Sequence, residues 1–388
     1  MEIYCSGIDE SALCLILLII MQQETQETRE QRELTPKEKR VELIKKLESA
    51  RGGTNVISYI LSTRGNASYQ MADDAVRLIY DHLKELSKQG TIKIDLFLHS
   101  FGGVGTVPWK LTNLIREFTS DFEILIPYKA YSAATLTALG ANKIWMHPMG
   151  ELGPVDPKVV NEFNPRDEKG NFIGINVEDT VSYIAFIKEA VGIRHEDELV
   201  QAFNILANKV HPLALGNIHR FYSQSRMIAK KLLRLHMKME EEYTITEIVD
   251  ALTTKLFFHG HPIHREEARE LNLKINNPSK KIEDLMWQLY KEYEKEMEMK
   301  NPFNPVEILN TANQDSIEYD VKGAYVESKT DTDVFISHYR IWRPPLPPLP
   351  LKIPPAQIPQ VEYQRQQLEA KRLGEANTTI LRQGWEKE

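Results

Sequence analysis

The chain has 388 residues, and its hydrophobic share of 42% and charged share of 27% are typical of a soluble globular protein. A formal net charge of −7, with no basic stripe interleaved with aromatic residues, argues against a nucleic-acid partner. The only two cysteines, Cys5 and Cys14, exclude a disulfide framework and a cysteine-based zinc site.

Residues 1–50 are predicted to form an N-terminal helical extension, with a solvated, highly charged helix at residues 24–50. An apolar run at residues 12–21 is too short to cross a bilayer, which needs about twenty residues. It lacks the basic residues and the cleavage site of a signal peptide, so we interpret it as a short buried or frayed helix. Whether it attaches to a membrane stays open. No later segment is long and apolar enough to span a membrane, and we expect a cytoplasmic protein.

Residues 51–280 alternate between strand-like and helix-like patterns. Runs of β-branched and aromatic residues predict strands at residues 55–62, 92–98, 122–127 and 143–146. Apolar positions at helical spacing predict helices at residues 69–86, 106–118, 133–141, 177–191, 196–208 and 214–239. This alternation is typical of an α/β fold in which helices cover both faces of a parallel sheet and crossovers are right-handed.

The last part of the chain is predicted to consist of extensions. Residues 281–340 are expected to be helical at first and then irregular, with short strand-like pieces. Residues 341–388 are expected to form a proline-rich arm and a polar, frayed helical tail. Eight prolines between residues 343 and 359 enforce polyproline II and forbid a helix there.

One serine, Ser132, stands in a turn of small residues between the third predicted strand and the next helix. A serine hydroxyl becomes a nucleophile when a base takes its proton, and its tetrahedral product needs hydrogen-bond donors. Gly102 and Gly103, in the turn after the second strand, and Ala133 are candidates to bind this oxyanion through their backbone N–H groups. The structural alternative is that Ser132 is a helix N-cap and the glycines are turn residues.

These motifs together resemble a known family. The resemblance lies in SFGG at residues 100–103, AYSA at residues 130–133 and the run GELGPVDP at residues 150–157. They are similar to motifs of the serine dehydrogenase proteinase family, which is related to the signal-peptide-peptidase-A-like and Clp-type serine peptidases. The resemblance covers roughly residues 50–280. It implies a Clp/crotonase-type fold, a peptidase domain at residues 51–280 and a serine endopeptidase that works through an acyl-enzyme without a cofactor.

The resemblance implies a lysine as the base in place of the histidine of Clp proteases. We favour Lys188, in the run SYIAFIKEAVG, because this run looks like the helix that carries the lysine in stomatin-cleaving relatives. Aromatic and aliphatic neighbours can desolvate a lysine and lower its pKa. Lys169 and His259 remain alternatives. Lys158 and His147 rank below them.

His259, His261 and His264 invite a metal site, but their spacing suits neither one helical face nor a common zinc motif. We therefore predict a turn that caps a helix starting at Arg265, and no metal. The expected partners are peptide or protein substrates, with membrane-derived peptides as one source, and further copies of the chain. The apolar helix at residues 214–239 is the expected contact surface of a homo-oligomer.

Two other functions stay open at this point. A crotonase-like acyl-CoA enzyme would share the fold and the oxyanion site but would not need the serine. A non-catalytic scaffold would use RPPLPPLP, at residues 343–350, to dock into aromatic grooves.

Overall fold

The computed structural model describes residues 34–348 and 357–388, apart from residues 89, 91, 156–157 and 256–260. Within these residues, eight strands form one sheet in the order β11-β7-β5-β4-β1-β12-β13-β14. The strands from β11 to β1 are parallel, and those from β1 to β14 pair antiparallel. In chain order these strands are β1 (Asn55–Leu61), β4 (Ile94–His99), β5 (Phe122–Ile126), β7 (Lys143–Met146), β11 (Ile275–Asn276), β12 (Ser316–Glu327), β13 (Thr332–Trp342) and β14 (Asn377–Lys387).

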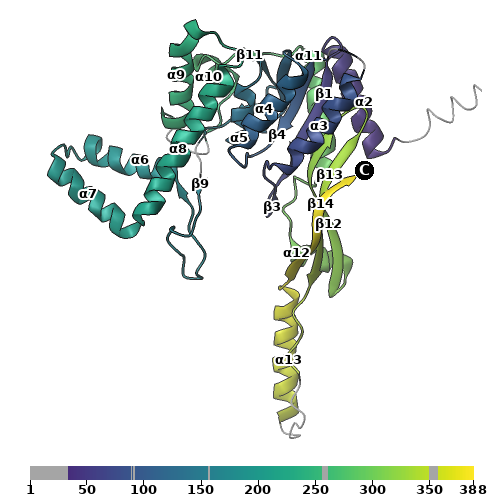
Figure 1. Ribbon diagram of the computed structural model, residues 1–388. Helices are drawn as coiled ribbons and strands as arrows, with labels where there is room; N and C mark the ends of the chain where they lie inside the picture. Colours follow the sequence, from purple (N-terminus) through teal and green to yellow (C-terminus); the bar gives the residue numbers. More distant parts are fainter. Residues whose placement is uncertain (1–33, 89, 91, 156–157, 256–260, 349–356) are drawn as a thin grey trace, which may run out of the picture.

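Helices cover both faces of this sheet, as predicted (Figure 1). Alternate residues of β1 belong to different cores, because successive side chains of a strand point to opposite faces. Ile57 and Tyr59 join the larger core, whereas Val56 and Ile60 join the smaller one. The larger core receives residues of α3 (Asp74–Ser87), α4 (Val107–Phe118), α5 (Ala133–Leu139), α8 (Pro212–Leu233), α9 (Glu242–Asp250) and α10 (Arg265–Glu270), and the smaller core those of α2 (Pro36–Ala50) and α11 (Lys280–Glu296).

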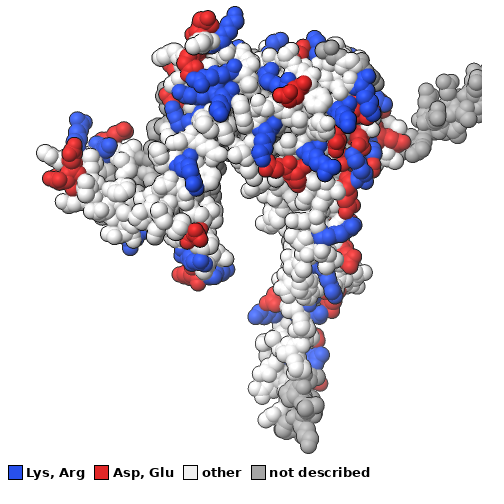
Figure 2. Space-filling view, in the orientation of Figure 1, with Lys and Arg blue, Asp and Glu red and all other residues white. Residues whose placement is uncertain are grey.

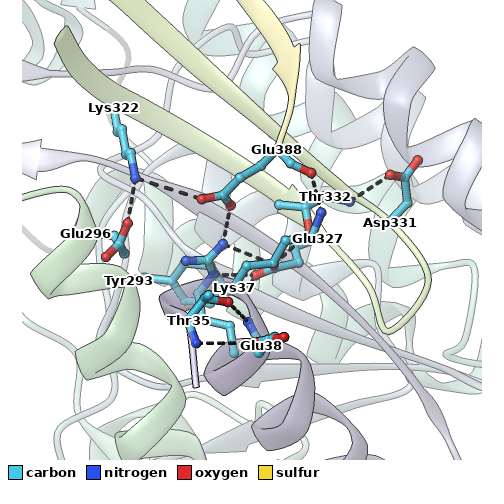
Figure 3. A network of polar contacts seen from close by, with 11 residues as sticks. Thr35, Lys37, Glu38, Tyr293, Glu296, Lys322, Glu327, Asp331, Thr332 and Glu388 are labelled. Atoms are coloured by element: carbon cyan, nitrogen blue, oxygen red, sulfur yellow. Dashed lines mark hydrogen bonds and ion pairs between the residues drawn. The ribbon is translucent and has the colours of Figure 1, made fainter. Parts of the chain in front are cut away.

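The N-terminal helix differs from its expected solvated form. Arg40, on α2, is fully buried and its Nε lies 2.8 Å from Glu327 Oε2 on β12. Figure 3 shows the surrounding network, in which Tyr293 donates a 2.5 Å hydrogen bond to the same carboxylate oxygen. A buried carboxylate needs such partners because water cannot solvate it there. The predicted helix is present at Pro36–Ala50, but its charge reflects buried ion pairing as well as solvation.

The C-terminal region also corrects the sequence-based expectations. Residues expected to be irregular form the long strands β12 and β13, and the tail expected to be a frayed helix contains β14. The period of two in β12, where Ile317, Tyr319 and Val321 share one face, is the pattern that a strand requires. These strands continue the central sheet through the pairing of β1 with β12. In Figure 1 their far ends and α13 (Ile358–Leu373) extend away from the body.

A second projection carries α6 (Val177–Ala185), the π-helical turn η1 (Phe186–Ala190), α7 (Glu196–Lys209) and the start of α8. The single helix predicted at residues 177–191 therefore changes to π-helical geometry in its second half. We call this projection, residues 177–222, the helical arm. The second half of α8 leaves the arm and packs Leu232 and Leu233 into the larger core. These two residues are thus core residues, whereas Phe221 and Met227 of the predicted oligomer surface are exposed. Figure 2 shows most of this face of the arm without charged side chains.

Candidate active site

Ser132 has a backbone conformation that few non-glycine residues adopt. It precedes α5 with φ 51° and ψ −112°. A positive φ is unfavourable for a side chain with a Cβ atom, and such outliers cost about 1–3 kcal/mol and gather at functional sites. The serine hydroxyl makes no capping hydrogen bond to α5. Ser132 therefore occupies the N-cap position without the hydrogen bond that gives an N-cap its stabilising effect.

Gly102 approaches the serine loop, and Gly103 approaches the backbone of Met71, so closely that neither glycine leaves room for a side chain. A Cβ atom on Gly102, at φ +103°, would lie 2.8 Å from Ser132 Cβ and 3.1 Å from the Ala133 backbone nitrogen. A Cβ atom on Gly103 would lie 2.3 Å from the Met71 carbonyl oxygen. Both glycines are thus required sterically, and three of the predicted site residues, Ser132, Gly102 and Ala133, lie together.

The backbone N–H groups of Gly102, Gly103 and Ala133 differ in whether they already have a hydrogen-bond acceptor. Gly102 N–H donates to Ser100 Oγ at 2.9 Å, so this predicted donor already has an acceptor. The Met71 N–H donates to the Gly102 carbonyl, and the Met71 carbonyl accepts the Val104 N–H. In such a parallel bridge between Met71 and Gly103, the N–H of Gly103 points away from Met71. Within the described ranges, the N–H groups of Gly103 and Ala133 have no acceptor. Each of these two N–H groups can donate a hydrogen bond to an oxygen atom of a bound ligand.

Hydrogen bonds with His99, the last residue of β4, and with Ser100 after it hold the serine loop in place. Ser100 N–H donates to Lys129 O at 2.9 Å, and Tyr131 N–H donates to Ser100 O at 3.0 Å. His99 Nδ1 accepts the Lys129 N–H at 3.2 Å. Burial, with a smaller effect of the nearby Lys129 charge, lowers the pKa of His99 to about 3, so its ring stays neutral and can accept. The sequence analysis gave no role to His99, and it used Ser100 only as part of the SFGG motif, although both residues adjoin the Gly-Gly turn.

Lys188, the predicted base, lies apart from this group. It is exposed on η1, in the helical arm, which Figure 1 shows separated from α5. It lines an open, mostly apolar cavity of about 670 Å³ together with Ile184, Phe203, Leu215 and Tyr222. No residue of the loops around Ser132 lines this cavity. The described chain therefore brings together the serine and its donors but not the serine and Lys188.

The structure does not support a catalytic role for the alternative bases either. Lys169 is exposed in a turn, where its backbone N–H donates to Asp167 at 2.9 Å. His259 lies outside the described residues, as does the side chain of Lys158. His147 follows β7 and has a structural role, because its Nδ1 accepts the Met149 N–H at 3.0 Å and its ring stacks on Trp287.

The other histidines of the HGHPIH run take part in local structure. His264 is the N-cap residue of α10, in agreement with the predicted turn before a helix. His261 Nε2 lies 2.7 Å from Glu267 Oε1. The described part of the chain holds no group of three or more histidine, cysteine or acidic side chains arranged for a metal ion. Its helices also include none with the length and hydropathy that a bilayer crossing requires.

Residues 8–167 match the family model described as ClpP-like SDH-type serine proteinase. The family resemblance is therefore confirmed. The matched residues include the Gly-Gly turn, Ser132 and the GELGPVDP run. Lys188 and the rest of the helical arm lie beyond the match.

Two relatives come from Methanocaldococcus jannaschii. The uncharacterized protein MJ0137 is 26% identical over 200 residues, which are 51% of this chain and 59% of the relative. The uncharacterized protein MJ1495 is 24% identical over 199 residues, which are 50% of this chain and 56% of the relative. The match thus spans less than two thirds of either relative.

Two solved structures of the 1510-N membrane-bound stomatin-specific protease are also similar. The first, a serine-to-alanine mutant, is 21% identical with a TM-score of 0.24, over 35% of this chain and 62% of the other. The second, a lysine-to-alanine mutant in complex with a substrate peptide, is 22% identical with a TM-score of 0.24, over 35% and 58%.

Proposed function

We propose that the protein is a serine endopeptidase in which Ser132 is the nucleophile. The observation that carries this proposal is the strained backbone of Ser132 without a capping hydrogen bond. A strained strand-to-helix turn that exposes a serine hydroxyl is a recurrent arrangement of serine hydrolases. The match to the family model over the same residues supports the peptidase class. The expected substrates are peptides or proteins, including peptides released from membranes.

The reaction follows the chemistry of acyl transfer. Ser132 Oγ attacks the carbonyl carbon of the peptide bond while a base takes the hydroxyl proton. The N–H groups of Gly103 and Ala133 donate to the developing oxyanion, and Gly102 allows the two loops to approach. The C–N bond then breaks, the base returns the proton to the amine, and an acyl-enzyme remains. Water attacks the ester in the same way and releases the carboxylic acid.

We keep Lys188 as the proposed base of a Ser/Lys dyad, on the strength of the resemblance alone. In this role its ammonium group must lose a proton and reach Ser132, which requires the helical arm of the same chain or of another copy to approach the site. The large apolar side chains exposed on α7, such as Val200, Phe203 and Ile205, favour contact with a further copy. A homo-oligomer is therefore part of the proposal.

A fluorophosphonate probe tests the nucleophile directly, because it labels activated serine hydroxyls. The wild-type chain should be labelled at Ser132, as read by peptide mass spectrometry, and the Ser132→Ala variant should not be labelled. Ser87→Ala, at the exposed end of α3, is a matched control that should keep the label. Labelling of a different serine, or none in a preparation that hydrolyses peptides, contradicts the assignment.

A further inference from the structure

Lys129 lies in the same loop as the proposed nucleophile and has an unusual environment. It belongs to the short strand β6 (Lys129–Ala130), three positions before Ser132. Its backbone is fixed on both sides, because its N–H donates to His99 Nδ1 and its carbonyl accepts from Ser100. The side chain therefore starts from a rigid point at the candidate site.

The ammonium group of Lys129 is surrounded by aromatic rings. Its Nζ atom lies 4.9 Å from the ring centre of Tyr128, 5.6 Å from that of Phe101 and 6.0 Å from that of Tyr131. Phe101 adjoins Gly102, and Tyr131 adjoins Ser132, so the rings come from both loops of the site. Phe101 and Tyr131 also stack on each other at 5.8 Å. These contacts hold the cation beside the place where a substrate would lie.

Among the described residues, no carboxylate lies within ion-pair distance of Lys129. Glu151 is its register partner in the pairing of β6 with β8 (Glu151–Leu152). The carboxylate of Glu151, however, accepts the hydroxyl of Tyr131. The Lys129 ammonium group is half-buried and contacts aromatic rings, but no anion neutralises it. It is therefore available to bind the carboxylate of a ligand. Phe101 is 42% exposed and Val104, two residues past Gly102, is 46% exposed, so the group borders open surface.

We propose that Lys129 is a specificity-determining residue that binds a carboxylate of the peptide substrate close to the scissile bond. This inference rests on the proposed peptidase function. The carboxylate can belong to an acidic side chain or to the C-terminus of a peptide. Because the contact exists before the reaction begins, it lowers KM and leaves kcat unchanged.

The test uses the full chain and pairs of fluorogenic peptides that differ in one carboxylate. In one series a glutamate near the cleavage site is replaced by glutamine, and in the other a free C-terminus is replaced by an amide. We expect the wild type to prefer the carboxylate in one series by on the order of tenfold to a hundredfold in kcat/KM. The series that shows the preference identifies the source of the carboxylate. High ionic strength should reduce it.

Three variants separate the roles that Lys129 can have. Lys129→Met keeps the length of the side chain and should remove the preference through KM, whereas Lys129→Arg should retain it. Lys129→Glu should favour peptides with a basic residue instead. Lys84→Met, at an exposed position of α3, is the matched control and should behave as the wild type. Melting temperatures check that each variant is folded.

The possible failures are distinguishable. Hydrolysis without any charge preference, or a preference that survives Lys129→Met, overturns the role of Lys129 alone. An equal loss of kcat on all peptides in Lys129→Met also overturns it, because that result identifies a catalytic or structural lysine. A wild-type chain that neither hydrolyses peptides nor reacts with the serine probe overturns the proposed function and this inference together.

Discussion

The two halves of the proposed dyad lie in very different surroundings. The loops around Ser132 follow the buried strands β4 and β5 and are joined by backbone hydrogen bonds. Lys188 lies on the helical arm, where Phe186 and Phe203 are 58% and 47% exposed. The first region is built by the core of a single chain, whereas the second leaves apolar surface uncovered. The turn that holds the proposed nucleophile is thus preorganised by folding, whereas the proposed base can serve it only if the arm packs against the site.

The largest effect is expected when the Ser132 hydroxyl is removed. Ser132→Ala should lower kcat for peptide hydrolysis by on the order of 10⁶-fold, because nothing else in the loop can form the acyl-enzyme. The melting temperature should change little, since alanine keeps the same backbone and loses only a hydroxyl that makes no capping bond. Steady-state kinetics and thermal unfolding measure the two effects. Residual activity near the wild-type level would place the chemistry elsewhere.

For Lys188 we predict a smaller effect on kcat, which depends on whether the chain forms a homo-oligomer. Lys188→Ala should lower kcat by about 10²–10⁴-fold, the usual contribution of a general base. Lys209→Ala, at an exposed position in the last turn of α7, is the matched control and should retain activity. Light scattering on the same samples should give a mass that is a multiple of 44.8 kDa. A fully active monomer would refute the contact between arms, and an unchanged rate in Lys188→Ala would transfer the role of base to another residue.

The buried His99 predicts a pH effect on stability in the serine region. Its pKa is about 3 in the fold and 6.5 in a model peptide, so between these values the unfolded chain binds more protons. The contribution of His99 therefore lowers the free energy of unfolding as pH falls from 6.5 towards 3, by up to about 1.4 kcal/mol per pH unit. In His99→Asn, whose amide oxygen can also accept the Lys129 N–H, this part of the slope should disappear. Urea unfolding at several pH values measures it, and equal slopes would contradict the assignment.

The smallest predicted effect concerns the strain at Ser132. Ser132→Gly should be more stable than Ser132→Ala by about 1 kcal/mol, because glycine adopts a positive φ without a penalty. At Ser87, in the last turn of α3, the order should reverse, since alanine is the better helix residue. Chemical unfolding of the four variants gives the comparison. If the same order appears at both positions, the turn at Ser132 is not strained.

The strands and helices around Ser132 were predicted well from the sequence because their signals are local. Buried parallel strands read as continuous apolar runs, and the Gly-Gly turn and the small residues around Ser132 mark where these strands end. The loss of Gly102 as a free donor was not predictable, since it depends on the rotamer of Ser100. The strand β12 carried a period of two in its sequence, but its partner β1 lies far away along the chain. Pairing over such a distance leaves no local trace.

The lysine region shows the limit of the same reasoning. An amphipathic run predicts a helix and an apolar face, and both α6 and α7 are present near their expected positions. The pattern does not specify against which surface that face packs. The resemblance suggested the role of Lys188, but the geometry that would support it requires a long-range contact that helical periodicity cannot encode.

The position of β1 in the sheet has a consequence for how the chain folds during synthesis. The strand β4 follows β1 closely in sequence and can pair with one of its sides early, and β5 and β7 can then extend the sheet from β4. The other side pairs with β12, which begins only at Ser316. Until the ribosome has released β12, an apolar strand at the centre of the future sheet has an unpaired edge, which is a template for aggregation. Nascent chains that stop before β12 should therefore need a chaperone to remain in solution, and a synonymous codon change that slows translation across the helical arm should lengthen that dependence.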